Sequence, residues 1–586
     1  MPTTTTQPAV LARGLHKRFR HTVAIDRIDL DIPQGQVFGL VGPDGSGKST
    51  VLKILSGLLL PDRGDCEIFG CDVIKNVESV RGLIGFVPQG LGLAVSDKLT
   101  VRQNIDFFAD LYHLPKDLAA QRSQRLLEIT NLHEFQSRLA RNLSGGMQQK
   151  LSLCCMLLHH PKLLILDEPT TGVDPVSRRD LWVILNDLVD TENITVVIAT
   201  SYLDEAERCH HVALVHAGKI LLQGSPTELP AKHGAPSLAD LFVAQLEPQA
   251  EHHFKPDSLH VVERINKDPL PPNKPAVEVT GLVKRFGHFT AVDHVNFEIP
   301  PGAMYGFLGP NGAGKTTAIK MLCGILQPSG GDAYIAGFHV WHQRRKLKNR
   351  IGYMSQKFSL YRDLKVIENL RLYRQIYGRQ THDVLEVDEL LEIVGLVGYE
   401  HRLTNELPVG LKQRLGLACS MVHLPDVLFL DEPTSGVDPL ARERFWEIVR
   451  FLSRKFGITL LLTTHYMDEA EYCDRLAMIN FGKIVAVGTP DQLKEQTRRE
   501  KGALLEIAAK DYQAAKRLVD EHIAQTVFFG RRLHVFSQTP QEHTTQILTL
   551  LHKNNLPDAT VRTAPIRLED VFIHFARRTN AAEATP

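Results

Sequence analysis

The chain has 586 residues, which is too long for a single hydrophobic core, and its 67 basic residues balance its 67 acidic ones. The length predicts about three to four domains, and a hydrophobic content of 43% with 23% charged residues is typical of a globular protein. A net charge of zero argues against extensive nucleic-acid binding, which normally leaves a basic surface.

The sequence predicts neither a membrane span nor a signal peptide, and its cysteines do not form a metal-binding pattern. No stretch reaches about 18 uninterrupted apolar residues, so we expect no membrane span in the chain, and the opening MPTTTTQPAV has neither the basic nor the apolar part of a signal peptide. The eight cysteines are scattered through mostly apolar runs without a C-x-x-C pair. We therefore predict reduced, buried cysteines and no zinc or iron–sulfur cluster.

The first motif along the chain is a glycine-rich segment, GPDGSGKST, which follows the short apolar run VFGLV. It fits G-x-x-x-x-G-K-[ST], in which backbone N–H groups at a helix N-terminus cradle phosphate. The lysine is expected to reach the β- and γ-phosphates, and the hydroxyl after it is expected to hold Mg²⁺. The predicted nucleotide-binding residues here are Gly42, Pro43, Asp44, Gly45, Ser46, Gly47, Lys48, Ser49 and Thr50.

A carboxylate pair follows the apolar run LLIL further along the chain. Asp167 ends this expected strand, which would place its carboxylate near Mg²⁺. Glu168 comes next and can orient or deprotonate the attacking water. Between Gln89 and Leu143 the pattern is helical, which predicts a separate helical subdomain.

The second half of the chain repeats the first in order and spacing. GPNGAGKTT begins at Gly309, 267 residues after Gly42, and LFLDEP supplies Asp431 and Glu432, each 264 residues after its counterpart. A register this steady indicates two copies of one domain of about 220 residues. The predicted nucleotide-binding residues of the second copy are Gly309, Pro310, Asn311, Gly312, Ala313, Gly314, Lys315, Thr316 and Thr317.

The pattern of short β-branched runs alternating with helical segments predicts an α/β fold with a largely parallel, buried sheet in each copy. We expect nucleotide-binding domains at residues 9–247 and 276–498, joined by a Pro- and charge-rich linker at 248–275. The ending PSLADLF of the first copy recurs as IRLEDVF 330 residues later, so about 66 residues are inserted before it. They predict a small C-terminal α+β module at 499–580.

The assembled motifs resemble the ATP-binding-cassette (ABC) ATPases over roughly residues 9–245 and 276–495. In the resemblance, LSGGM is the signature loop, with Ser144, Gly145 and Gly146 as nucleotide contacts. Phe19 and Phe286 occupy the position of the aromatic that stacks on adenine, although a phenylalanine alone is also typical of a core. The resemblance also makes Gln89 and Gln356 the Q-loop glutamines, which take part in catalysis and in binding the metal ion. In the same resemblance, His465 is the switch histidine, which contacts the γ-phosphate.

The family pairs two such domains head to tail, each ATP lying between the Walker motifs of one domain and the signature of the other. Here the copies are unequal. Ser201 stands where the second copy has His465, and Pro408 and Val409 stand where the first copy has Ser144 and Gly145. Under the head-to-tail rule both departures fall in one composite site. We expect the other site to turn over ATP, and the degenerate site either to hydrolyse slowly or still to work, since Lys48, Asp167 and Glu168 remain.

TTHYMDEAE, SGVDP and the ending LEDVF are similar to the ABC-2-type exporters, especially their tandem drug-efflux ATPases. That resemblance implies an ATP-hydrolysing subunit, with ATP and Mg²⁺ as cofactors. It also implies a place on the cytoplasmic face of the cell membrane, bound to separate integral-membrane permease subunits. The alternative is a soluble tandem-cassette, ribosome-associated translation factor, but such proteins usually carry a long basic linker and two intact signatures. The transported substrate is not readable from this chain.

Overall fold

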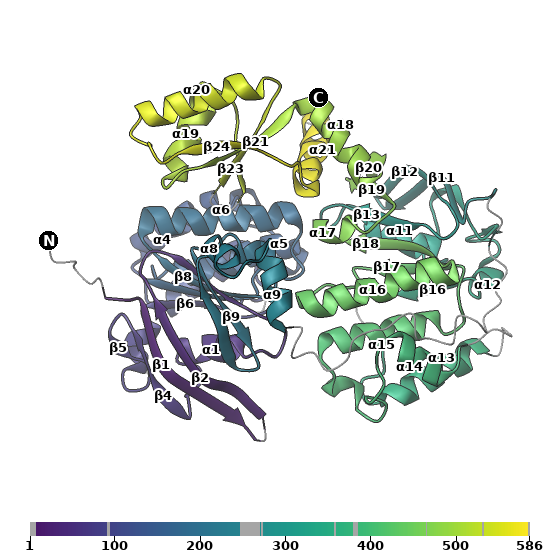
Figure 1. The fold of residues 1–586 in the computed structure, drawn as a ribbon, viewed down its shortest axis with the longest axis horizontal. Helices are drawn as coiled ribbons and strands as arrows, with labels where there is room; N and C mark the ends of the chain where they lie inside the picture. The colour runs from purple at the N-terminus through teal and green to yellow at the C-terminus, as the bar shows by residue number, and fades with distance from the viewer. Residues whose placement is uncertain are drawn as a thin grey trace. The chain divides into compact units, whose positions relative to one another are not determined.

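The structure is a computed structural model, and it describes residues 7–20, 22–90, 94–246, 270, 273–356, 359–378, 385–464, 466–529 and 532–583. The chain forms two compact units (Figure 1). Most of the linker expected at 248–275 lies outside the described residues. The expected domain boundaries remain predictions.

The first repeat is built on a six-stranded sheet in the order β10-β9-β3-β8-β7-β6, parallel except for its edge strand β10. Its strands are continuous apolar runs because both faces are buried. In β7, Leu163 and Ile165 join one hydrophobic cluster, and Leu164 and Leu166 join the cluster on the opposite face. The strands are β3 (Val37–Val41), β6 (Ile84–Val87), β7 (Leu163–Asp167), β8 (Thr195–Thr200), β9 (His211–His216) and β10 (Lys219–Gly224).

An antiparallel sheet, in the order β2-β1-β4-β5, forms the second layer of this repeat. Its inward-facing residues share one hydrophobic cluster with α1 and with one face of the parallel sheet. The strands are β1 (Val10–Phe19), β2 (Thr22–Ile32), β4 (Arg63–Ile68) and β5 (Cys71–Asp72). The helices of the nucleotide-binding core are α1 (Lys48–Leu55), α2 (Val77–Arg81), α6 (Pro175–Glu192), α7 (Leu203–Ala206), α8 (Glu228–Lys232) and α9 (Leu238–Leu246).

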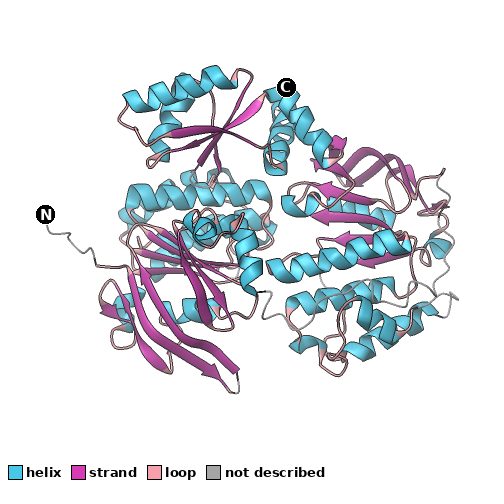
Figure 2. Cartoon of the chain, viewed as in Figure 1, coloured by secondary structure: helices cyan, strands magenta, loops and turns pink. Residues whose placement is uncertain are grey.

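The expected helical subdomain lies between β6 and β7 and consists of α3 (Val101–Leu111), α4 (Lys116–Ile129) and α5 (Gly145–Leu157). Helix α3 begins with a reciprocal cap between Thr100 and Gln103, which satisfies two backbone N–H groups that the first turn leaves free. The buried apolar side chains of the three helices belong to the cluster on the second face of the parallel sheet. Figure 2 draws the helices of the chain in cyan and its strands in magenta.

The second repeat has the same topology, with a six-stranded sheet β16-β17-β18-β13-β19-β20 and a four-stranded sheet β12-β11-β14-β15. Its strands are β11 (Val277–Phe286), β12 (Phe289–Ile299), β13 (Met304–Leu308), β14 (Gly330–Ile335), β15 (Phe338–His339), β16 (Ile351–Met354), β17 (Val427–Asp431), β18 (Thr459–Thr464), β19 (Arg475–Asn480) and β20 (Lys483–Gly488). Its helices are α11 (Lys315–Leu322), α12 (Arg344–Leu347), α13 (Val366–Gly378), α14 (Val387–Ile393), α15 (Val409–Met421), α16 (Pro439–Phe456), α17 (Met467–Ala470) and α18 (Pro490–Lys501).

The C-terminal module is a β-α-β-β-α-β unit whose sheet has the order β22-β23-β21-β24, with every neighbouring pair antiparallel. Its elements are β21 (Ala503–Ala508), α19 (Tyr512–His522), β22 (Val527–Phe529), β23 (Arg532–Ser537), α20 (Pro540–Lys553) and β24 (Thr560–Ala564). The final helix, α21 (Leu568–Glu583), contacts α17, α18, β19 and β20 of the second repeat. The module is therefore inserted between α18 and α21.

The predicted α/β fold class is confirmed: two tandem phosphate-loop domains, each with a mixed, largely parallel β core and a helical subdomain, and a small C-terminal α+β module. Among the residues that the structure describes, no helix has both the length and the apolar character needed to cross a membrane.

Candidate nucleotide-binding and catalytic sites

The glycine-rich loop of each repeat joins a buried parallel strand to a helix, β3 to α1 and β13 to α11. Gly47 and Gly314 precede the helices with φ of 108° and 102°, in a region that only glycine enters without strain. A Cβ on Gly47 would also lie 2.5 Å from the carbonyl oxygen of Ala24. The loop can adopt this path only because these positions carry no side chain.

The lysine of each loop folds back over the loop. The Nζ atom of Lys48 donates to the carbonyl oxygens of Gly42 at 2.7 Å and Pro43 at 3.0 Å. Lys315 makes the same two bonds to Gly309 and Pro310, at 2.7 and 3.0 Å. The ammonium groups are thereby held at the loop, where phosphate oxygens accept charge-assisted hydrogen bonds.

The hydroxyl after each lysine contacts the carboxylate at the end of β7 in the first repeat and of β17 in the second. Ser49 Oγ donates to Asp167 Oδ1 at 3.0 Å, and Thr316 Oγ1 donates to Asp431 Oδ1 at 3.0 Å. A hydroxyl and a carboxylate meeting at a phosphate loop are the hard oxygen donors that Mg²⁺ prefers. The residues present therefore fit a magnesium ion in both repeats.

The glutamate after each aspartate has a left-handed backbone, with φ of 47° at Glu168 and 48° at Glu432. Non-glycine residues rarely adopt this conformation, and it is enriched at functional sites. It turns each side chain towards a glutamine: Gln89 Nε2 donates to Glu168 Oε2 at 2.8 Å, and Gln356 Nε2 donates to Glu432 Oε2 at 2.7 Å. The structure thus brings together, within each repeat, the lysine, hydroxyl, aspartate, glutamate and glutamine that the sequence singled out.

Burial raises the pKa of Asp167, of Glu168 and of Asp431, because charged carboxylates lose solvation there. For Glu168 the neighbouring charge of Asp167 adds to the rise, and Lys48, whose Nζ is 3.8 Å from Glu168 Oε1, opposes it. A carboxylate with a raised pKa is a stronger base at neutral pH. This suits the role of proton acceptor from water.

The two candidate adenine-stacking residues lie at the ends of β1 and β11 and are not part of the core. Phe19 is 46% exposed and Phe286 is 50% exposed. A lysine ammonium lies over each ring, Lys17 at 5.8 Å and Lys284 at 5.1 Å from the ring centroid. Core packing, the alternative for these phenylalanines, is therefore wrong, and the stacking role remains a prediction.

The signature residues begin helix α5. Ser144 is its N-cap and accepts a hydrogen bond from Met147 N at 3.3 Å. Gly146 is closely packed, since a Cβ there would lie 2.4 Å from Ser177 Cβ. In the second repeat α15 begins at the equivalent position, but its N-cap is Pro408, which makes no side-chain cap. The backbone course is retained and the hydroxyl is lost.

The switch histidine, His465, lies outside the described residues, so its predicted role stays a prediction. Its counterpart in the first repeat, Ser201, is fully buried, and among the described residues its hydroxyl has no hydrogen-bond partner.

Several buried residues around this position were not singled out from the sequence. Thr200 and Thr170 both donate to Glu205, which is fully buried, and the second repeat repeats this arrangement with Thr464, Thr434 and Glu469. Within each repeat, these contacts join the end of β8 or β18 to the loop that follows Glu168 or Glu432. The repetition of ATSYLDEAE as TTHYMDEAE contained the signal, because both copies keep the threonine and the glutamate.

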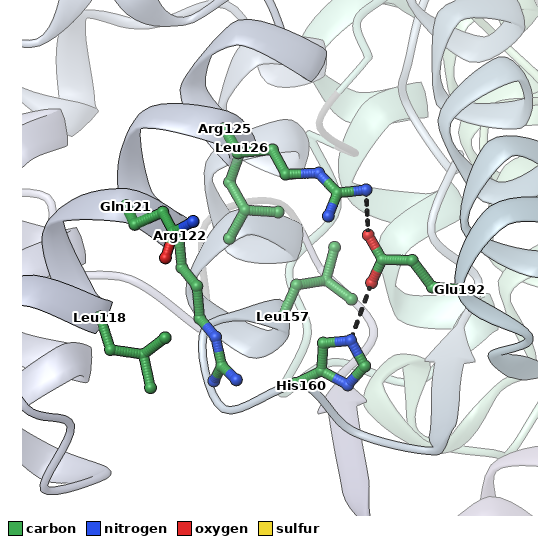
Figure 3. A pocket seen from close by; sticks show the side chains of 8 residues that line it. All are labelled: Leu118, Gln121, Arg122, Arg125, Leu126, Leu157, His160 and Glu192. Carbon is green, nitrogen blue, oxygen red and sulfur yellow. Dashed lines mark ion pairs between the residues drawn. The ribbon is translucent and has the colours of Figure 1, made fainter.

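The first repeat also has a small hollow between α4, the end of α5 and the end of α6 (Figure 3). Glu192 pairs there with Arg125 at 2.7 Å and with His160 at 3.3 Å. Arg122 donates to the carbonyl oxygen of Leu158 at 2.8 Å. Its lining includes none of the residues of the phosphate loop, and its charged groups already have partners, so we assign it no part in nucleotide binding.

Comparison with known proteins agrees with this geometry. The family model described as "ABC transporter" matches residues 25–171 and 292–435, which contain both phosphate loops and both aspartate–glutamate pairs. One relative is the probable multidrug ABC transporter ATP-binding protein YbhF of Escherichia coli (strain K12). It is 40% identical over 558 residues, which cover 84% of this chain and 95% of the relative.

Two other matches extend the comparison. The Nod factor export ATP-binding protein I of Ralstonia nicotianae is 34% identical over 307 residues, covering 52% of this chain and 94% of the relative. Among solved structures, an RNase-L inhibitor is similar with a TM-score of 0.58, covering 83% of this chain and 93% of that one. At 21% sequence identity, this last similarity shows the fold alone.

Proposed function

Because this chain belongs to the ABC transporter family, we propose that it is the ATP-hydrolysing subunit of an ABC-2-type exporter for drugs or other small molecules. The chain binds ATP through its two cassettes and is an ATPase. The observation that carries the proposal is the 40% identity to a probable multidrug transporter ATP-binding protein over 95% of that protein's length. Separate integral-membrane permease subunits complete the proposed transporter and hold this chain at the cytoplasmic face of the cell membrane.

In the proposed reaction, Lys315 holds the β- and γ-phosphates through its ammonium group, which the loop carbonyls already orient. Glu432 accepts the proton of the attacking water, and Gln356 holds the glutamate side chain in place through its 2.7 Å bond. When bound, Mg²⁺ neutralises charge on the phosphate oxygens; Thr316 and Asp431 would hold it. The same roles in the first repeat belong to Lys48, Glu168, Gln89, Ser49 and Asp167.

We further propose that the two sites differ in rate. The second repeat supplies a complete catalytic set, and the first supplies an intact signature with Ser144 as a capped helix start. The opposite combination has Ser201 at the switch position and Pro408 at the signature. Loss of one donor that stabilises developing charge costs about 2.7–4 kcal/mol in the transition state. The combination of Ser201 with Pro408 is therefore expected to bind ATP and hydrolyse it slowly.

The test is the ATPase rate of Glu432→Gln and Glu168→Gln, with the exposed Glu495→Gln of α18 as a control. We expect Glu432→Gln to lower kcat by about 100-fold or more and Glu168→Gln to lower it by less than about 3-fold. Equal losses in the two variants would overturn the asymmetry. An unchanged rate in both would overturn the assigned role of these glutamates.

The transport function is tested by tagged purification from detergent-solubilised native membranes, with mass spectrometry of the proteins that co-purify. We expect one or two multi-span membrane proteins at near-equal stoichiometry. Recovery of ribosomal proteins, with the ATPase in the soluble fraction, would instead favour the ribosome-associated alternative.

A further inference from the structure

The two repeats differ at a third position, which lies on the strand beside the catalytic carboxylates. In both repeats the aspartate pairs in register with a residue of the neighbouring parallel strand, Asp167 with Ala199 and Asp431 with Thr463. Both neighbours are fully buried. The first repeat therefore has a methyl group where the second has a hydroxyl.

The hydroxyl of Thr463 makes two hydrogen bonds. Its Oγ1 donates to Asp431 Oδ1 at 2.7 Å and accepts from the backbone N–H of Glu432 at 3.0 Å. A hydroxyl has one hydrogen to donate, so its single donor capacity is spent on the carboxylate. A β-branched side chain on a strand also has few accessible rotamers, so the oxygen is held in one place.

Asp431 Oδ1 consequently accepts two hydroxyl donors, Thr463 on one strand and Thr316 on the phosphate loop at 3.0 Å. In the first repeat the aspartate accepts a hydroxyl from Ser49 alone among the described residues. The N–H of Glu168 donates to the carbonyl oxygen of Ala199 at 2.9 Å, and the N–H of Glu432 likewise donates to the carbonyl oxygen of Thr463 at 3.1 Å, so the repeats share this backbone bond and differ in the hydroxyl contacts of Thr463. If the loop hydroxyl turns towards a metal ion, Asp431 keeps a donor that holds its orientation. Asp167 has no such second hydroxyl donor among the described residues of the first repeat.

A tyrosine beside Asp431 is a further hydroxyl-bearing residue that the first repeat lacks at the equivalent position. Tyr353 of β16 stands where the first repeat has Phe86. The hydroxyl of Tyr353 interacts with the carboxylate of Asp431. The surroundings of this carboxylate are therefore richer in hydroxyl groups in the second repeat than in the first.

We propose that Thr463 is a positioning residue for ATP hydrolysis, which links the metal-side carboxylate of Asp431 to the left-handed backbone of Glu432 and restricts full activity to the second repeat. This inference rests on the proposed function, in which Glu432 acts on water and Asp431 holds Mg²⁺. Thr463 itself touches neither nucleotide nor water in the proposed reaction, and it acts through the two carboxylate residues. The asymmetry of the sites then has a source inside one repeat, in addition to the switch and signature positions.

The test compares Thr463→Val, which keeps the shape and removes the hydroxyl, with Thr463→Ser, which keeps the hydroxyl. Thr459→Val is the matched control, because Thr459 lies on the same strand, is equally buried, and uses its Oγ1 to accept from Gly302 N at 2.9 Å. Four residues along a strand place it about 13 Å from the site. All variants are made in the full-length chain.

Two readouts are needed, kcat with KM for ATP, and the affinity for Mn²⁺ with ATP by electron paramagnetic resonance in a Glu432→Gln background. We expect Thr463→Val to lower kcat roughly 10-fold with little change in KM and to weaken Mn²⁺ binding. Thr463→Ser is expected to restore both, and Thr459→Val to leave both unchanged. Should Thr463→Val not fold, Thr463→Ala introduces the side chain that the first repeat already accommodates at this position.

Normal kcat and Mn²⁺ affinity in Thr463→Val would overturn the inference, as would an equal loss in Thr459→Val. These outcomes are distinct from failure of the proposed function. That failure appears as a wild-type ATPase rate that Glu432→Gln does not reduce, whatever the Thr463 variants do.

Discussion

A buried ion-pair cluster between the C-terminal module and the last helix provides the sharpest stability prediction. His534 of β23 lies with Nδ1 at 3.0 Å from Asp570 of α21 and Nε2 at 3.6 Å from Glu506 of β21. The three side chains are 4–6% exposed. We predict that Asp570→Asn loosens the attachment of α21 to the module.

The internal repeat supplies the matched control. Asp240 occupies the equivalent place in the first turn of α9, but it is exposed, and among the described residues its carboxylate bonds only to Ser237, at 2.6 Å. Breaking a buried ion pair costs about 3–5 kcal/mol. In Asp570→Asn the asparagine can still accept a hydrogen bond from His534, and Glu506 remains. We therefore expect Asp570→Asn to lower the local opening free energy by about 1–3 kcal/mol, and Asp240→Asn to lower it by less than about 0.5 kcal/mol.

The assay must resolve one part of the chain, because a multidomain protein has no single unfolding equilibrium. Hydrogen exchange followed by mass spectrometry reports the local opening free energy of β23 and α21 peptides. Faster exchange in both peptides is the expected result for Asp570→Asn. Unaltered exchange there, or an equal change for Asp240→Asn in α9, would refute the reasoning.

The effect also depends on pH. Burial alone would lower the pKa of His534, but Asp570 and Glu506 outweigh it and raise the pKa above the ordinary value of 6.5. The stabilisation is therefore complete below about pH 6.5 and is lost as the pH rises through the folded-state pKa. The wild type and Asp570→Asn should accordingly differ most near pH 6 and converge at alkaline pH.

Glu506 sets the lower end of the pH range over which this ion-pair cluster stabilises the module. Burial opposes its ionisation, but His534, Arg532 and Arg562 outweigh it and lower its pKa from 4.5 to about 2. Its contribution is present above pH 4.5 and is lost as the pH falls towards 2. Exchange in β21 of the wild type should therefore accelerate on acidification over that range.

Two further predictions concern exposed and buried side chains. Phe286→Ala should weaken ATP binding by about 1–2 kcal/mol through lost adenine stacking without changing thermal stability, because the ring is 50% exposed; fluorescent-nucleotide titration checks this, and unaltered affinity would exclude stacking. Of the eight cysteines only Cys71 is not buried, and burial raises the thiol pKa to about 12 at both Cys66 and Cys154. A thiol reagent should therefore modify one cysteine quickly in the native protein and all eight in denaturant, and rapid native modification of several would contradict the structure.

Many of the site residues could be predicted because each stands where the local backbone requires it, at a turn with positive φ or at the end of an apolar strand. Gly47 and Gly314 are required where the loop turns into a helix with positive φ, and Asp167 and Asp431 end strands whose apolar runs are unambiguous. The spacing of the repeat then related each residue to its partner. The inserted residues also predicted a small α+β module, but no local pattern indicates β22, which has three residues, or β24, whose TVRTA lacks an apolar face.

What the sequence by itself determined is the inventory: two phosphate loops, two carboxylate pairs, one intact signature and one altered one. Only the tertiary structure decided which residues meet across neighbouring strands. Thr463 and Asp431 are 32 residues apart and become partners through the parallel register of β17 and β18. His534 and Asp570, 36 residues apart, meet through the packing of the module against α21. Such pairings depend on strand order and on which faces are buried, and these are set by the folded core rather than by any local pattern.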